Sequence, residues 1–296
     1  MKVNMDEIQL IEIPQQKPEY SRFIGSWLVR GAKTILVDVG PANTADNLIS
    51  LLKGRGIFHI DYVLLTHIHI DHAGALGKLL QEYQEAKAVC HEKALRYLVE
   101  PEKLWQGSLK VLGQVAEMYG PPIPTSPTRL IAHNEFKLKD LTIIDTPGHA
   151  PHHLSFEYNG RLFSGEAAGN YLMFNDRDYL RPATPPRFFL EMFVSSIEKL
   201  RRLPDQIICY AHFGSASSSH DMLDRFKEQV LFWAEIIGQE ARQGGDDIIK
   251  RCIERLIAED GNLACFDEMD AHVRARELNF MANAVKGFLG YLEEDG

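Results

Sequence analysis

The chain has 296 residues, of which 45% are hydrophobic and 25% charged, a composition typical of water-soluble globular proteins. Its 41 acidic and 32 basic residues give a formal net charge of −9, which argues against a nucleic-acid-binding surface because such surfaces are normally basic. No apolar run reaches the length of a membrane span, and the first residues lack the apolar core of a signal peptide. We therefore expect a cytoplasmic protein that binds neither nucleic acid nor a membrane.

The four cysteines lie far apart in the sequence, and no two of them form a C-x-x-C pair. They are Cys90, Cys209, Cys252 and Cys265. This pattern is typical of reduced, mostly buried thiols in a cytosolic protein, and it favours neither a disulfide framework nor a zinc knuckle.

The first part of the chain alternates strand and helix patterns. Apolar and β-branched residues predict strands over 8–13, 22–30 and 34–40, then a helix from Asn43 or Thr44 to about Lys53, and a buried strand over 61–65. Alternation of this kind is typical of an α/β protein.

A cluster of polar side chains follows the strand over 61–65, in the segment Thr66-His67-Ile68-His69-Ile70-Asp71-His72-Ala73-Gly74. A helical pattern begins at Ala75, so the cluster lies at the carboxyl end of a strand, where open α/β sheets place their chemistry. Burying these groups without partners would cost about 1–3 kcal/mol each. Metal binding explains them best, and four ligands within six residues suit two adjacent metal ions better than one.

Residues 86–91 predict a further strand, and residues 92–119 predict two helices. The proline-rich loop 120–127 ends the second helix, because proline cannot continue a helix. We interpret residues from about 92 to 127 as an excursion over the surface of the domain. It either covers one side of the site or is a packing insertion.

Three further strands end in residues of the metal-ligand type. A strand over 136–144 leads to His149, a hairpin around Asn159-Gly160 leads to Glu166, and a strand over 206–211 leads to His212. Because the carboxyl ends of several strands can meet at one rim, we expect these side chains to join the first cluster. His152 and His153 favour structural or supporting roles.

The stretch 171–181 follows Glu166 closely and mixes aromatic with basic residues. Tyr171, Phe174, Arg177 and Arg181 are candidates to line an acyl pocket or to hold a carboxylate or phosphate group of a substrate. A surface loop is the alternative interpretation.

The chain then turns helical, beginning with an amphipathic helix over 186–203. From about Ser217 only helices are predicted, over 221–239, 246–259 and 277–293. The last has apolar residues at the spacing of one helix face. Three roles stay open for these helices: packing on the core, capping the active site, or forming a homodimer face.

The motifs together resemble those of the metallo-β-lactamase superfamily of hydrolases. The matching segments are Thr66-His67-x-His69-x-Asp71-His72, Pro147-Gly148-His149, Ser164-Gly165-Glu166 and Ala211-His212-Phe213-Gly214. The resemblance spans roughly residues 8–216 and implies a four-layer αββα sandwich with a two-metal site on one edge. We therefore expect a catalytic core over 1–216, with the added C-terminal helical segment over 217–296.

The resemblance also implies how two divalent ions would be held. His67, His69 and His149 would bind the first ion, and Asp71, His72 and His212 the second. Glu166 stands where the family usually has a bridging Asp. It bridges the ions from a backbone set further back, binds only one of them, or swings away and leaves the second site weak. Zinc suits imidazole and carboxylate ligands best, with iron or manganese as alternatives.

The leading functional hypothesis is hydrolysis of a small acyl substrate. Two such ions can bring the pKa of a bridging water near neutrality, and Asp71 would orient that water, which gives it a catalytic role. A looser resemblance to the glyoxalase II-like branch favours a thioester, or a related ester or lactone, as the substrate. The alternatives are a nuclease of the RNase Z type, an iron enzyme of the persulfide dioxygenase type, and a binding-only protein.

Overall fold

The computed structural model describes residues 7–186 and 188–294, which form two compact units. The first unit comprises the described residues up to Gln16, together with Ser21–Ile143 and Phe156–Asn159. The second comprises Lys17–Tyr20, Ile144–Ser155 and the described residues from Gly160 onward. All described residues from Gly160 onward, including the C-terminal helices, thus fall in the same unit. The expected division of the chain at residue 216 stays a prediction.

The first unit is built on a six-stranded mixed sheet with the strand order β1-β2-β3-β4-β5-β6. The strands are β1 (Glu7–Glu12), β2 (Gly25–Arg30), β3 (Thr34–Val37), β4 (Tyr62–Leu64), β5 (Lys87–Cys90) and β6 (Leu130–Ala132). The pairs from β1 to β3 are antiparallel, and those from β3 to β6 are parallel. The central strands are apolar and buried, as expected for strands covered on both faces. Strand β6, with only three residues, was missed by the sequence analysis.

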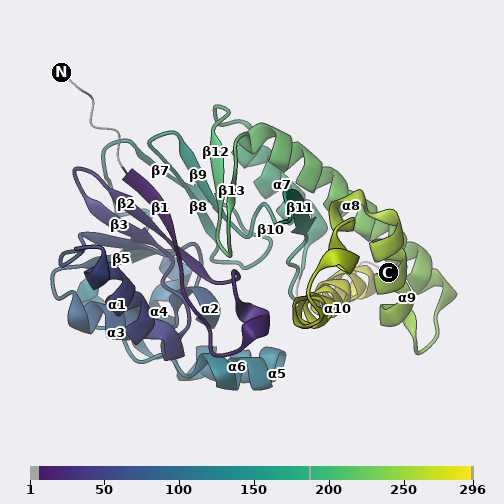
Figure 1. Cartoon of the computed structure of the whole chain (residues 1–296), viewed down its shortest axis with the longest axis horizontal. Helices are drawn as coiled ribbons and strands as arrows, with labels where there is room; N and C mark the ends of the chain where they lie inside the picture. Colours follow the sequence, from purple (N-terminus) through teal and green to yellow (C-terminus); the bar gives the residue numbers. More distant parts are fainter. Residues whose placement is uncertain (1–6, 187, 295–296) are drawn as a thin grey trace. The chain divides into compact units, whose positions relative to one another are not determined.

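The helices of the first unit follow the strands in chain order. They are α1 (Ala45–Gly54), α2 (Ile70–Ala73), α3 (Leu76–Glu82), α4 (Leu95–Val99), α5 (Glu102–Leu112) and α6 (Gln114–Tyr119). Figure 1 shows α1 and α3 next to each other beside the sheet. The excursion contains three helices instead of the two expected, because Pro101 and Gly113 divide it into shorter pieces.

The second sheet is also mixed, with the strand order β13-β12-β9-β8-β7. Its strands are β7 (Leu141–Asp145), β8 (Leu154–Tyr158), β9 (Arg161–Gly165), β12 (Ile207–Tyr210) and β13 (Ser215–Ala216). The predicted strand over 136–144 is correct only from Leu141, because residues 136–138 are irregular and residues 139–140 form a turn in which Asp140 has a positive φ. The hairpin at Asn159-Gly160 is confirmed, with both residues at positive φ as a type I′ turn requires.

Residues 170–181 form a two-stranded antiparallel sheet, β10 (Asn170–Phe174) and β11 (Arg177–Arg181). Asn175 and Asp176 make the turn, both at positive φ, which asparagine and aspartate tolerate better than other side chains. The alternative of a plain surface loop for this stretch is wrong.

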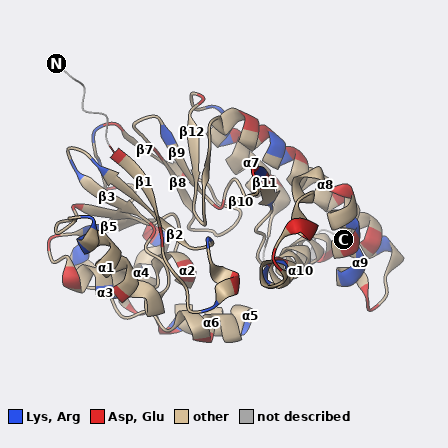
Figure 2. Ribbon diagram, viewed as in Figure 1, with Lys and Arg blue, Asp and Glu red and all other residues tan. Residues whose placement is uncertain are grey.

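The helices of the second unit pack around one apolar cluster. They are α7 (Leu190–Arg201), α8 (Ser219–Gln243), α9 (Ile248–Glu259) and α10 (Ala271–Glu294). Helices α8, α9 and α10 contact one another, and acidic and basic residues are interspersed along α8 and α9 (Figures 1 and 2). Met281, Val285 and Phe288 of α10 are fully buried in the cluster, so its apolar face serves core packing, whereas Leu278 is exposed.

A buried ion network ties α10 to β11. Arg181 Nε donates to Glu277 Oε2 at 2.5 Å, and Arg276 Nε donates to Glu277 Oε1 at 2.8 Å. All three side chains are at most 3% exposed. Burial acts to raise the pKa of Glu277, but the two arginines outweigh it and hold that pKa below the ordinary 4.5. Glu277 is therefore ionised between two cations that have no access to water.

Two predictions from composition can be compared with the structure. All four cysteines are free and buried, and burial raises the pKa of Cys90 and of Cys209 to about 12, so the expectation of buried thiols is confirmed. None of the helices in residues 7–186 and 188–294 combines the length and apolar character that a membrane span needs. The cytoplasmic location stays a prediction.

Replacing Glu277 should destabilise the second unit strongly. Glu277→Gln leaves two buried guanidinium groups without a carboxylate, a change that costs about 3–5 kcal/mol in buried pairs. Because the folded-state pKa of Glu277 lies below its unfolded value, its stabilisation is present above about pH 4.5 and is lost as the pH falls through the folded pKa. Urea unfolding at several pH values measures both effects. The control is Glu268→Gln, which breaks a half-exposed pair with Arg177 and should change stability by less than about 1 kcal/mol.

Candidate metal centre

The first group of candidate ligands lies where β4 gives way to α2. His67 and His72 are 1% and 2% exposed, and His69 and Asp71 are partly exposed. His69 is the residue before α2, and both His72 N and Ala73 N donate to its carbonyl oxygen. The chain thus leaves the buried strand and enters a single helical turn, which places all four ligand candidates on one short segment of the first unit.

Hydrogen bonds fix the protonation of His67. The Thr66 hydroxyl donates to Asp38 Oδ2 at 2.7 Å, because a carboxylate only accepts, so its oxygen is left to accept from His67 Nδ1 at 3.0 Å. The Nε2 lone pair of His67 is then available for a metal. That atom lies 3.0 Å from His69 Nδ1. Two imidazole nitrogens facing each other at this distance can share a cation.

Asp38 is a supporting residue that the sequence analysis missed. Its Oδ1 accepts from Thr66 N at 2.8 Å, and its Oδ2 accepts from His72 Nδ1 at 3.1 Å. This bond makes Nδ1 the protonated nitrogen of His72 and directs the Nε2 lone pair away from Asp38, the arrangement by which carboxylates orient metal-binding histidines. His72 Nε2 lies 3.6 Å from Asp71 Oδ2. Asp38 follows a buried strand, so the rule that found the other ligands could have found it.

The second group centres on Glu166, which is 4% exposed and follows β9. Its Oε2 lies 2.7 Å from His149 Nε2, and its Oε1 lies 3.2 Å from His212 Nε2. His149 follows β7 and His212 follows β12, so three separate segments meet at one carboxylate. Within the second unit, the structure therefore brings together the three residues that the motifs selected.

A tight approach to α7 sets the position of His149. Gly148 has a φ of +143°, and a Cβ there would lie 2.3 Å from the ring of Phe193 in α7. Only glycine fits such a close approach. His149 Nδ1 donates to the Ala183 carbonyl at 2.8 Å, since a carbonyl can only accept. The other ring nitrogen, Nε2, then either carries a second proton that it donates to Glu166 or binds a cation that Glu166 also binds.

His153 holds the backbone of Glu166. Glu166 N donates to His153 Nε2 at 3.0 Å, which leaves the proton of that ring on Nδ1, where it donates to Thr146 Oγ1 at 2.8 Å. The Thr146 hydroxyl also lies 3.0 Å from Ser155 Oγ. Because both ring nitrogens of His153 have partners, its role is structural, as the sequence analysis favoured.

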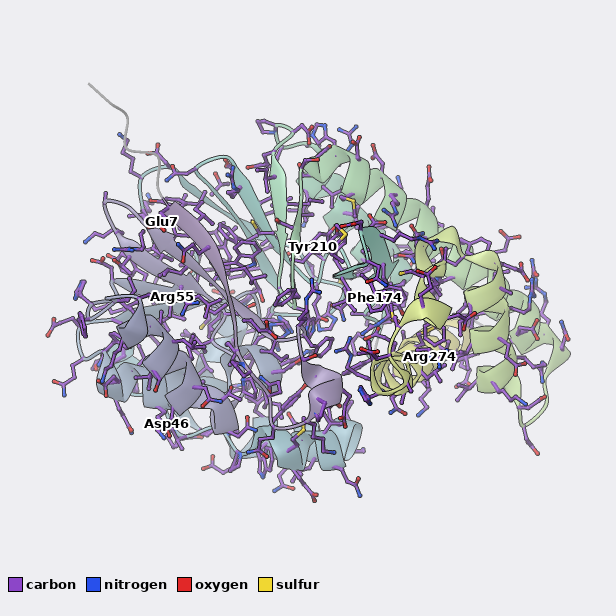
Figure 3. The ribbon with its side chains drawn as sticks, in the orientation of Figure 1. Glu7, Asp46, Arg55, Phe174, Tyr210 and Arg274 are labelled. Atoms are coloured by element: carbon purple, nitrogen blue, oxygen red, sulfur yellow. The ribbon has the colours of Figure 1, made fainter. Side chains whose placement is uncertain are left out.

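The four candidate substrate residues do not form one surface in the structure. Tyr171 is buried and stacks on Tyr210, with ring centroids 4.7 Å apart. Phe174 is partly buried against the apolar cluster (Tyr210 and Phe174 are labelled in Figure 3), Arg177 is exposed and pairs with Glu268, and Arg181 is buried with Glu277. Their assignment to substrate binding stays a prediction.

The donor set fits a divalent metal ion in chemistry and in spacing. Two ligand atoms of a tetrahedral zinc ion, each about 2.1 Å from the metal, lie about 3.4 Å apart. The pairs His67–His69, His149–Glu166 and His212–Glu166 have donor atoms 2.7–3.2 Å apart, so small movements would admit an ion to each. Each unit therefore carries histidine and carboxylate side chains whose possible ligand atoms lie close together.

Comparison with known proteins identifies the class. The profile of the metallo-β-lactamase superfamily matches residues 22–212, which include both groups of ligand candidates. The chain belongs to this superfamily. The predicted α/β fold of the metallo-β-lactamase class, with two mixed sheets and added C-terminal helices, is thereby confirmed.

Individual relatives differ in how much of the chain they match. The metallo-β-lactamase fold-containing protein ST1585 of Sulfurisphaera tokodaii is 31% identical over 83% of this chain and 93% of its own length. A crystal structure of ST1585 covers 96% of this chain and 98% of its own, with a TM-score of 0.65. "Probable metallo-hydrolase MJ0888" of Methanocaldococcus jannaschii is 31% identical over 51% of this chain and 70% of its length. A hydroxyacylglutathione hydrolase of Aliivibrio fischeri is 26% identical over 69% of this chain and 71% of its length.

Asp38→Asn should weaken metal binding. An amide nitrogen facing His72 Nδ1 would favour the wrong tautomer, and loss of such a supporting carboxylate typically lowers metal affinity 10- to 100-fold. Competition with a chromogenic chelator measures the change. Asp46→Asn is the matched control, because Asp46 is an exposed side chain that pairs only with Lys78 among the contacts described. Equal affinities for the two variants would contradict the role given to Asp38.

Proposed function

We propose that this protein is a metal-dependent hydrolase that binds two divalent ions, with zinc the first candidate and iron or manganese next. His67, His69 and His149 would hold one ion, and Asp71, His72 and His212 the other. The observation that carries the proposal is the position of Glu166, whose two oxygens each face the Nε2 atom of a different histidine. That is the placement required of a carboxylate that bridges two ions.

The longer side chain of Glu166 is compatible with this role. A glutamate in place of the usual aspartate needs a backbone set further back, and the hydrogen bonds of the turn 164–169 hold the backbone of Glu166 in a fixed position. Ala167 N donates to the Ser164 carbonyl, Gly169 N donates to the Glu166 carbonyl, and His153 accepts from Glu166 N. These contacts support Glu166 as the bridging ligand.

Two bound ions would supply acidity to a water molecule and polarise a substrate carbonyl. The side chains of the protein would orient the water and the metal-binding rings. Asp71, partly exposed, would accept a hydrogen bond from the attacking water and orient it. Asp38 and Thr66 keep the rings of His72 and His67 in the tautomers that leave Nε2 unprotonated. Glu166, buried between two imidazoles, would be ionised, and its negative charge would offset part of the positive charge of the ions.

We propose a small acyl substrate, most specifically a thioester or a related ester or lactone. Support comes from the superfamily membership and from the distant likeness to a hydroxyacylglutathione hydrolase, at 26% identity. The net charge of −9 supports a small-molecule substrate over a nucleic acid, since it would repel a polyanion. The glyoxalase II-like branch is thus part of the proposal.

The purified protein should contain two equivalents of divalent metal per chain. Elemental analysis gives the number and the identity of the ions, and dialysis against a strong chelator should remove both and abolish acyl-ester hydrolysis. Readdition of the same metal should restore it. Activity that survives full removal of the metal would contradict the proposal.

Histidine variants test both groups of ligands. His69→Ala and His149→Ala should each lower metal content by about one equivalent and reduce turnover at least 100-fold, since a lost ligand leaves an incomplete coordination sphere. His59→Ala and His272→Ala are the matched controls, because both histidines are exposed, and they should retain two equivalents. Unchanged metal content in either ligand variant would remove that residue from the site.

A substrate panel distinguishes the proposal from its alternatives. Acyl-thioesters and lactones should be hydrolysed with kcat/KM at least 100-fold above that for phosphodiesters of similar size. A preference for phosphodiesters, with nucleic-acid binding at low salt, would favour a nuclease instead. Oxygen consumption by an iron-loaded sample would favour oxidative chemistry.

A further inference from the structure

Asn170, the first residue of β10, joins the proposed bridging carboxylate to a buried cation. It is 6% exposed, and its Nδ2 donates to Glu166 Oε1 at 3.0 Å. Its Oδ1 accepts from Nη1 and Nη2 of Arg181 at 3.2 and 3.3 Å. This orientation of the amide is assigned from its partners, because the reverse would face donor to donor and acceptor to acceptor.

The contacts continue from Arg181 to the C-terminal helix. Arg181 is 1% exposed, and its Nε donates to Glu277 of α10. Burial acts to lower the pKa of Arg181, but Glu277 and, to a smaller extent, Glu166 raise it. The charge of Arg181 is therefore coupled to both carboxylates, with Asn170 making the hydrogen bonds between Arg181 and Glu166.

A glutamate at position 166 makes such an anchor necessary. Glutamate has one more rotatable bond than aspartate, so its carboxylate can turn away from the two histidines unless something holds it. His153 fixes only the backbone of this residue. Asn170, which is not among the proposed ligands, donates a hydrogen bond to the carboxylate itself.

We propose that Asn170, oriented by Arg181 and through it by Glu277, is a positioning residue that keeps Oε2 of Glu166 toward His149 and Oε1 toward His212, the two proposed metal ligands of the second unit. The inference rests on the proposed function, because it assigns Asn170 to the same metal centre. It also gives α10 a role in that centre, as the helix that supplies the last member of the chain Glu166–Asn170–Arg181–Glu277.

Asn170→Asp tests the inference with little change in shape. An aspartate still accepts from Arg181 but cannot donate to Glu166, and it places a second negative charge beside that carboxylate. We expect the affinity for one of the two metal equivalents to fall 10- to 100-fold, measured by chelator competition. Asn159→Asp is the control, because Asn159 lies in an exposed turn that an Asp-Gly pair also favours, and it should bind both equivalents like the wild type.

A double-mutant cycle separates positioning from general structural support. Glu166→Asp withdraws the carboxylate from Asn170, so Asn170→Asp should lower metal affinity far less in that background than in the wild type. An equal loss in both backgrounds would show that Asn170 does not act through Glu166. Asn170→Ala, which removes the donor without adding charge, repeats the test if the aspartate prevents folding, as judged by thermal unfolding of the metal-free protein.

The outcomes for the two proposals are distinct. If the wild-type protein holds two equivalents of metal and the Asn170→Asp variant binds both with the same affinity as the wild type, the role of Asn170 is overturned and the proposed function is not. Wild-type protein without bound metal would overturn the proposed function, and this inference with it.

Discussion

The structure of the second unit depends on the burial of one carboxylate. Glu166 is almost fully removed from water, and an isolated charge in that position would be prohibitively unfavourable. The fold compensates it with two imidazoles, an amide and, through the amide, a guanidinium. Each partner comes from a different segment: His149 after β7, Asn170 at the start of β10 and His212 after β12. Because these segments must come together, the positions of the second sheet, of the β10–β11 hairpin and of α10 are constrained at the same time.

In the first unit, the buried carboxylate of Asp38 likewise has several hydrogen-bond partners. Asp38 has a φ of +55°, in the left-handed region, and its carboxylate accepts from a backbone amide, a hydroxyl and an imidazole. One residue therefore fixes the turn after β3, the start of the ligand segment and the tautomer of His72. In both units a ligand is oriented by a neighbour that would not itself touch a metal. Such neighbours determine how firmly a metal could be held, because a ring that can rotate or change tautomer binds weakly.

Much of this arrangement could be predicted from the sequence, for a physical reason. Ligand residues at strand ends are local signals, and each of His67, His149, Glu166 and His212 follows an apolar run. The supporting residues were harder to find. Glu277 lies 96 positions after Arg181, and no periodicity indicates that a polar residue on a strand will meet one on a helix so much later in the chain. The sequence analysis missed the short strand β6 and the division of 92–119 into three helices, because each of these features depends on only a few residues. The apolar face of α10 was predictable, but its polar contribution through Glu277 was not.

The buried pairing of β11 with α10 also bears on how the chain can vary. A shortened chain that ended before residue 271 would lose Glu277 and Arg276 together, and buried Arg181 would lose the carboxylate to which its Nε donates. Relatives that lack this helix would need a different residue at position 181, or a different way to neutralise it. Loss of the terminal helix should therefore be accompanied by exchanges at positions 170 and 181.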